Sequence, residues 1–135
     1  MTSPQKTTPV DRSRAGAFLA KAQEFMRSAK RSLEEGDDSA AALLAVHAGI
    51  SACDSITVWH LGRRSNSSRH LDVLALLKGL SFEGKEGVER QLRELLAEKH
   101  EVEYEDRRLL AGDAEKMVKL AERIVRAAER VQGKR

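Results

Sequence analysis

The chain has 135 residues, a length that fits one domain with a hydrophobic core of its own. Charged residues make up 33% of the sequence and no apolar run is long enough to span a membrane, so we expect no membrane insertion. The net charge is only +3, and the single cysteine, Cys53, excludes an internal disulfide framework. Aromatic residues are scarce at 4%, whereas the helix formers Ala, Leu, Glu, Arg and Lys dominate. Together these features predict a cytoplasmic, all-α protein.

The N-terminal residues 1–10 contain both prolines and are expected to form a disordered arm, whereas residues 11–135 are expected to form a single helical-bundle domain. Asp11 or Ser13 can cap a first helix whose apolar residues recur on one face. Gly36 is expected to end this helix, because glycine readily adopts the left-handed conformation found at helix C-termini.

A second helix is predicted between Gly36 and Gly62, and it is apolar on nearly every side. A helix with so little polar surface usually lies at the centre of a bundle or in a subunit interface. One small bundle has too few helices to cover it completely. We therefore expect a homodimer that buries the remainder.

Three further helices are expected in the second half of the chain. The loop 62–68 precedes a short third helix over 69–78, and a glycine-containing loop leads to a fourth helix over 88–107. Asp113 is expected to cap the last helix. Because short connections place consecutive helices antiparallel, the predicted fold is an up-and-down helical bundle of four to five antiparallel helices.

Three polar residues, His47, Ser51 and Asp54, share one face of the apolar second helix. A buried carboxylate needs partners if it is to stay charged. The line of polar residues indicates either a ligand-binding cleft or a hydrogen-bond network that fixes the register of the helices, and the second is the commoner case. His47 and Asp54 are therefore candidate binding residues.

In the fourth helix, Lys99 interrupts the apolar stripe, and Glu103 and Tyr104 follow one turn later. Lys99 either extends outward into solvent or faces a pocket between helices, where its charge would hold an anion. If Lys99 faces such a pocket, Lys99, Glu103 and Tyr104 are candidate binding residues.

Two segments are rich in basic residues. The stretch 62–70 contains no acid and offers Arg63, Arg64 and Arg69 to a phosphate group. The last helix carries a basic stripe, but acids lie beside it at i,i+4 spacing, so we expect a solvated, self-paired face. The residues of this stripe are Lys116, Lys119, Arg123, Arg126 and Arg130, and the expected pairs are Glu115–Lys119 and Glu122–Arg126.

No spacing of His, Cys, Asp or Glu matches a metal-binding signature. The di-iron bundles use Glu-x-x-His on two helices, whereas this sequence has His100-x-x-Glu103 once and in reverse order. We therefore expect no metal site and no cofactor.

The order of these features resembles HEPN domains over roughly residues 15–131. The small prokaryotic members carry Arg-x-x-x-Asp-Tyr in the fourth helix, and this chain has Lys99-His100-Glu101-Val102-Glu103-Tyr104 at that place. The spacing is kept, while Arg is replaced by Lys and Asp by Glu. His70 occupies the position of the family's histidine at the start of the third helix.

The resemblance implies a bundle that dimerises through the motif-bearing helices and associates with nucleotides or RNA. Many similar proteins are metal-independent endoribonucleases, often toxins paired with a nucleotidyltransferase-like antitoxin. Their catalytic motif is Arg, four to six residues, then His. Arg93 with His100 and Arg64 with His70 fit this spacing, but Arg93 lies nearly two turns early and Arg64 precedes its helix.

The resemblance therefore favours an RNA- or nucleotide-binding protein of a regulatory, toxin–antitoxin or defence system over an enzyme. An endoribonuclease is the alternative, in which His100, Lys99 and His70 are the catalytic candidates: a histidine would move the proton and a cation would stabilise the phosphorane. Lys99 would act there as a point charge, because it lacks the bidentate fork of arginine. A structural partner subunit without a nucleotide site is a third possibility.

Overall fold

The computed structural model describes residues 7–66, 71–104, 109 and 111–133, without the side chains of residues 71, 100–104 and 111. The described residues form an all-α bundle, which confirms the predicted fold class. The helices are α1 (Ala15–Glu34), α2 (Asp38–Leu61), α3 (Leu71–Lys78), α4 (Lys85–Tyr104) and α5 (Ala111–Val131), with a 3-10 turn, η1 (Arg12–Arg14), before α1. A two-stranded ribbon is formed by β1 (Thr7–Pro9) and β2 (Arg63–Ser65).

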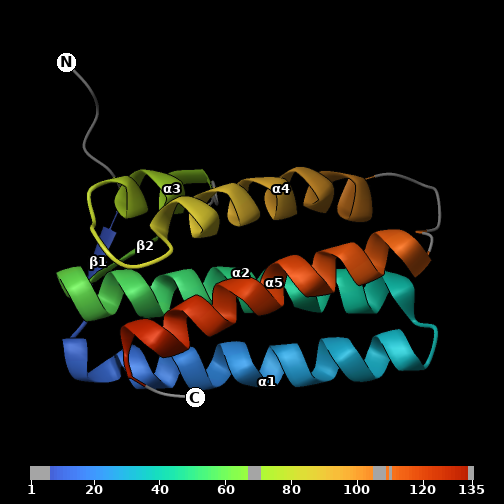
Figure 1. Ribbon diagram of the computed structural model, residues 1–135, viewed down its shortest axis with the longest axis horizontal. Helices are drawn as coiled ribbons and strands as arrows, with labels where there is room; N and C mark the ends of the chain where they lie inside the picture. Colours follow the sequence, from blue (N-terminus) through green and yellow to red (C-terminus); the bar gives the residue numbers. More distant parts are fainter. Residues whose placement is uncertain (1–6, 67–70, 105–108, 110, 134–135) are drawn as a thin grey trace.

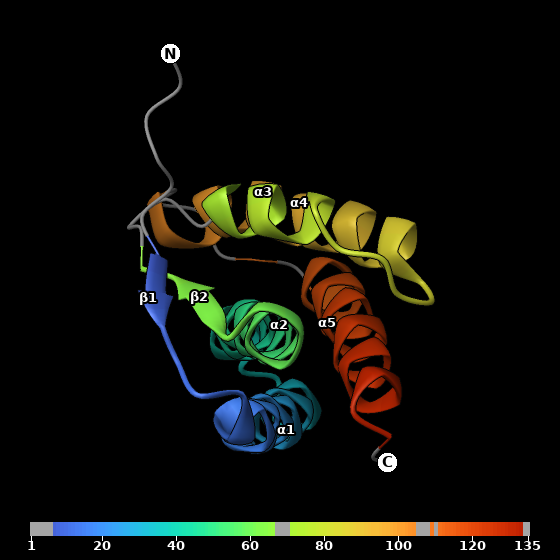
Figure 2. The ribbon, with the colours of Figure 1, turned by 90° about the vertical axis from the view of Figure 1, so that its left-hand side faces the viewer.

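Helix α2 lies at the centre of the bundle. It packs against α1 on one side and against α5 on another, and α3 and α4 lie across a third side (Figures 1 and 2). α1 and α2 run in opposite directions, as do α4 and α5 (Figure 1). The buried side chains of α1, α2, α3, α4 and α5 belong to one continuous core, which explains why a helix as apolar as α2 is stable in this position.

Several predicted helix boundaries are confirmed. The Asp11 side chain accepts a hydrogen bond from the Ser13 backbone N–H at 2.9 Å, which caps η1 at the start of α1. Gly62 follows α2 with a φ of 65° and donates its N–H to the Val58 carbonyl. Here the left-handed conformation requires glycine, because a Cβ would clash with the backbone.

The last two helices begin earlier than the sequence pattern indicated. α4 starts at Lys85 rather than near residue 88, because Gly84 (φ 87°) makes the turn and its carbonyl accepts the N–H of Val88. α5 starts at Ala111, so Asp113 lies in its first turn instead of capping it. An acid in the first turn still stabilises a helix through its dipole.

Part of the expected disordered arm is ordered. Thr7–Pro9 pairs antiparallel with Arg63–Ser65, and the Val10 N–H donates to the Gly62 carbonyl at 2.9 Å. Side chains reinforce the pairing: Arg63 donates to the Thr7 hydroxyl at 2.9 Å. Strand pairing depends on a segment more than fifty residues away, so local composition did not reveal it.

By length and composition, α2 is apolar enough to cross a membrane, but 78% of its apolar window is buried inside this bundle. Burial of this kind is what the core helix of a folded domain shows. The apolar character of α2 is therefore explained by its central position.

Candidate functional site

Two residues proposed separately from the sequence, Asp54 and Arg64, meet in the structure. Asp54 is only 5% exposed on α2, and its Oδ2 lies 3.7 Å from Nε of Arg64 on β2. This distance is too long for a hydrogen bond, so the attraction is coulombic. The Arg64 guanidinium also lies over the ring of Phe18 on α1, 5.4 Å from its centroid. The pair thus joins β2 to both α1 and α2.

Burial dominates the electrostatics of Asp54. It raises the pKa of this carboxyl to about 6, although Arg64 and then Lys21 act in the opposite direction. The neighbouring Cys53 thiol is fully buried, and burial followed by the charge of Asp54 raises its pKa. A thiol held protonated in this way is not a nucleophile.

His47 is exposed and its ring contacts Phe25 of α1, with the centroids 5.8 Å apart. Gly49, two residues later and about 200° around the helix, faces Leu95 of α4. His47 and Asp54 therefore lie on the side of α2 away from α4. Within one chain they do not form a common cleft with the residues of the fourth-helix motif.

Among the motif residues, Lys99 is half-buried on α4 and has a polar partner. His100, Glu103 and Tyr104 belong to the same helix, but their side chains are outside the described residues, as are Arg69 and His70 entirely. Arg63 is exposed and engaged with Thr7. The structure therefore joins Asp54 to Arg64 and leaves the motif of α4 as a separate group.

The basic stripe of α5 is not self-paired along its whole length. Arg126 donates to Glu122 at 2.8 Å, as predicted, and Glu122 also pairs with Lys30 of α1 at 2.5 Å. Glu129 accepts a hydrogen bond from Gln23 of α1 at 2.8 Å. In the described part of the chain, however, no ion pair joins Glu115 to Lys119. Two acids of α5 are thus engaged by α1.

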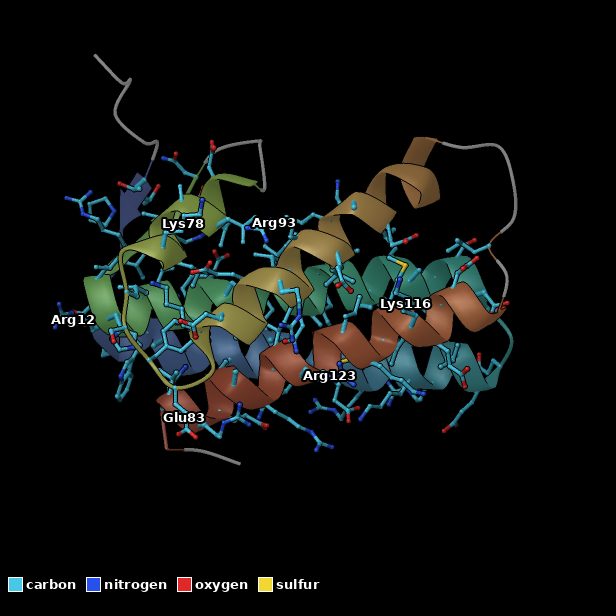
Figure 3. The ribbon with its side chains drawn as sticks, turned by 45° about the horizontal axis from the view of Figure 1, so that its top comes forward. Arg12, Lys78, Glu83, Arg93, Lys116 and Arg123 are labelled. Atoms are coloured by element: carbon cyan, nitrogen blue, oxygen red, sulfur yellow. The ribbon has the colours of Figure 1, made fainter. Side chains whose placement is uncertain are left out.

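On the side of α5 that faces α4, arginines gather in a hollow of about 230 Å³, which we call the arginine hollow. Its lining comes from the start of α4 and its preceding turn, and from the C-terminal half of α5: Gly84, Gly87, Val88, Gln91, Arg123, Arg126, Ala127 and Arg130. No acid lines it. Arg123 and Arg130 form no ion pair with any described residue. Figure 3 shows Arg123 about midway along α5 and Lys116 nearer its start.

The arginine hollow extends toward the N-terminal half of α5 through a second hollow of about 360 Å³. Lys116, Lys119 and Arg123 line it together with Glu94 of α4 and Glu115. Arg123 belongs to both hollows, so the two are adjacent. This second hollow contains both signs of charge, whereas the arginine hollow contains only positive charge and therefore suits an anion better.

The chemistry of the arginine hollow is anion binding. Arginine guanidinium groups bind phosphate through paired N–H donors, and they remain charged at any physiological pH. The start of α4 adds a small favourable potential for an anion. In the described part of the chain, no cluster of three His, Cys, Asp or Glu side chains that could hold a metal ion is found.

The sequence contained the arginines of this hollow but not the reason to single them out. Among them only Arg126 has an acid at i,i+4 spacing, Glu122, and the structure shows that Lys30 of α1 shares this acid. The sequence also did not predict that Gly84 and Gly87 line the hollow, because they lie in a segment predicted to be a loop. Helical periodicity does indicate one part of the hollow, because Arg123 and Arg130 are seven residues apart and therefore share one face of the helix.

The comparisons with known proteins agree with the fold. A search of curated proteins finds no match to the chain. A family model described as HEPN domain matches residues 15–131, which takes in all five helices. The chain belongs to the HEPN domain family.

Proposed function

We propose that the chain binds RNA or a nucleotide, as a regulatory, toxin–antitoxin or defence-associated member of the HEPN family. The observation that carries this proposal is the arginine hollow, in which Arg123 and Arg130 form no ion pair with described residues. Family membership supports it, because HEPN proteins are often associated with RNases or nucleotides. The part of the ligand that binds in the arginine hollow is a phosphate group.

The charges of α5 support a phosphate ligand in two ways. First, Lys30 of α1 partly compensates the charge of Glu122, and the carboxylate of Glu129 accepts a hydrogen bond from Gln23 of α1, so both acids are engaged on the α1 side. Second, the adjacent Lys116 and Lys119 extend the positive surface along the same helix. A phosphodiester chain could follow this line, whereas a single phosphate would occupy the arginine hollow alone.

The test is fluorescence anisotropy with a labelled single-stranded RNA at about 50 and 200 mM salt, the range in which phosphate contacts weaken measurably. We expect the double variant Arg123→Ala/Arg130→Ala to bind at least about tenfold more weakly at low salt. The slope of log affinity against log salt should fall by about 1.4, since each phosphate contact on a single strand contributes about 0.7.

The single variants Arg123→Ala and Arg130→Ala have a matched control in Arg31→Ala, which also removes one positive charge. Arg31 is exposed in the last turn of α1, where its side chain bonds Ser28. The affinity and salt slope of Arg31→Ala should remain those of the unmodified chain. Absence of binding by the unmodified chain to both RNA and a free nucleotide at low salt would refute the proposal and favour a structural partner subunit. An equal loss in Arg31→Ala would show that only net charge matters.

We propose that the chain binds RNA without cleaving it. Its support is that the fourth-helix motif has Lys99 where the resembling proteins have arginine, so bidentate stabilisation of a phosphorane is lost. Purified protein should leave tRNA and mRNA intact. Cleavage that disappears in His100→Ala or His70→Ala would establish the endoribonuclease instead.

A homodimer is part of the proposal, and a nucleotidyltransferase-like protein is the proposed partner in a toxin–antitoxin pair. Large apolar side chains near the end of α2 support self-association, since Trp59 is 42% and Leu61 40% exposed. Light scattering should give twice the chain mass of 15.0 kDa. A mass equal to one chain at every concentration would exclude the homodimer.

A further inference from the structure

A third hollow adjoins the arginine hollow at the end of the bundle where α2 stops. It has a volume of about 270 Å³ and is lined by His60, Ser81, Phe82, Glu83, Arg130 and Val131; we call it the aromatic hollow. Arg130 lines both hollows. The loop that carries Glu83 passes over the C-terminal part of α5, as Figure 3 shows.

The aromatic hollow has a flat, stacked lining. The rings of His60 and Phe82 lie 5.9 Å apart with an angle of 26° between their planes. Phe82 is half-buried, so part of its ring stays accessible. Nucleobases stack on aromatic side chains of this kind. The hollow is smaller than the 300–1,000 Å³ typical of sites for whole drug-sized ligands, so it suits a single ring system.

Polar groups are available for the edge of that ring system. His60 Nε2 is buried and therefore not exposed to the hollow, so His60 contributes the face of its ring. Burial, followed by the charge of Arg12, lowers the pKa of His60, so this ring is neutral at neutral pH. The Ser81 hydroxyl and the Glu83 carboxylate line the same hollow. These groups match the mixed donors and acceptors of a base.

The two hollows differ in charge, and this difference fixes the orientation of a ligand that spans them. Glu83 lines the aromatic hollow and repels a phosphate, whereas Arg123, Arg126 and Arg130 line the arginine hollow and attract one. Arg130 lies between the two: a Cβ at Gly84 would be 3.6 Å from its Nη2. That distance is ordinary van der Waals contact, and it is the φ of 87° that favours glycine at residue 84.

We propose that the aromatic and arginine hollows together form a mononucleotide subsite, with the base stacked on the His60–Phe82 pair and its phosphate bound by Arg123 and Arg130. The inference rests on the proposed RNA or nucleotide binding and specifies its ligand as a base linked to a phosphate. Such a group comes either from a free nucleotide or from a nucleotide of an RNA strand. The arms of the experiment distinguish the two sources.

The experiment is calorimetric titration with AMP, with ribose 5-phosphate, which lacks the base, and with single-stranded RNA. AMP should bind about 5- to 100-fold more tightly than ribose 5-phosphate, because stacking of one base contributes about 1–3 kcal/mol. Phe82→Leu, which keeps apolar volume against the core, should remove this preference and leave ribose 5-phosphate binding unchanged. Arg123→Ala should weaken both.

The control variant is Phe25→Leu, a half-buried aromatic of α1 that lines neither hollow. It should keep the preference for AMP. Equal binding of AMP and ribose 5-phosphate by the unmodified chain would overturn the subsite, and so would loss of the preference in Phe25→Leu. Unchanged ribose 5-phosphate binding in Phe82→Leu also shows that this variant is folded.

The outcomes separate the subsite from the proposed function. RNA binding that depends on Arg123 but not on Phe82 would overturn the subsite while the proposed function stands. AMP binding that depends on both residues, without RNA binding, would support the subsite and identify a free nucleotide as the ligand. RNA binding that depends on both would support the subsite and identify a nucleotide of a strand. Absence of binding to RNA and AMP would reject both.

Discussion

The buried carboxylate of Asp54 on α2 lies 3.7 Å from the guanidinium of Arg64 on β2, across the turn that ends the helix. The nine residues between them include Gly62, whose left-handed conformation reverses the chain. Because β2 also pairs with β1, this contact connects the N-terminal segment to the centre of the bundle. A charge buried in this way has consequences for the stability of the fold.

We predict that Asp54→Asn changes the pH dependence of stability. The folded pKa of Asp54 is about 6, above the 3.8 of an unperturbed aspartate, so the folded state binds more protons than the unfolded state between these values. Its stabilising contribution is therefore fully present below about pH 4 and is lost as the pH rises through 6. The loss amounts to about 3 kcal/mol, at 1.36 kcal/mol for each pKa unit.

Urea unfolding of both proteins at several pH values between 4 and 7.5 measures this effect. The free energy of unfolding of Asp54→Asn, relative to the unmodified chain, should rise across that range. Comparing the two proteins cancels the titration of other groups. Two parallel curves would show that Asp54 titrates alike in the folded and unfolded states.

Gly49→Ala is predicted to destabilise the packing of α2 against α4. A Cβ at this position would lie 2.7 Å from Cδ2 of Leu95 and 3.5 Å from Cδ1 of Ile124, and both of these residues are fully buried. Overpacking should cost about 1–3 kcal/mol, partly offset by about 1 kcal/mol from the higher helix propensity of alanine. Thermal or urea unfolding would measure the net loss.

Gly112→Ala provides the matched control, because nothing lies within 4 Å of a Cβ there and the residue is exposed in α5. It should leave stability unchanged or raise it by up to about 1 kcal/mol. If Gly49→Ala behaved in the same way, Leu95 would have to move without cost, and the close approach of α2 and α4 would not depend on glycine.

Glu122→Gln is predicted to strengthen anion binding in the arginine hollow. Glu122 neutralises Arg126 and Lys30, and hydrogen bonding and attraction to these cations lower its pKa, with Lys30 the larger cause. Removing its charge releases the Arg126 guanidinium for phosphate, so RNA affinity should rise severalfold at low salt and less at high salt. Because the ion pairs are largely exposed, the stability loss should stay below about 1 kcal/mol.

The same anisotropy titration measures this gain, and Glu24→Gln removes an identical charge from an exposed site of α1 as its control. A gain of equal size in both variants would assign the effect to net charge. No gain in Glu122→Gln would place Arg126 outside the binding site, with Arg123 and Arg130 then carrying the phosphate contacts.

The candidate site was only partly predictable from the sequence, and His47 and Asp54 show why. Their common face on α2 follows from a spacing of seven residues, and it was predicted correctly. Which element would cover that face was not predictable, because side-chain periodicity says nothing about neighbours in space. The structure places α1 and β2 there, so Asp54 pairs with Arg64 rather than with the motif of α4.

What the sequence alone determined is the set of helices and most of their ends. Alanine and leucine periodicity, the Asp11 cap and the glycines at positions 36 and 62 act within one or two turns, so local chemistry was sufficient to predict them. Resemblance at the Lys99–Tyr104 motif was sufficient to indicate the HEPN family.

Only the tertiary structure decided the rest. The pairing of Thr7–Pro9 with Arg63–Ser65, the Asp54–Arg64 contact and the arginine hollow each depend on residues brought together from distant segments. Charge compensation in particular is a property of three-dimensional packing. Arg123 and Arg130 have no acid three or four residues away along α5, and the packing of the bundle brings no described acid into an ion pair with them. Coulombic attraction depends on distance in space rather than on separation along the chain, so only the tertiary structure decided this.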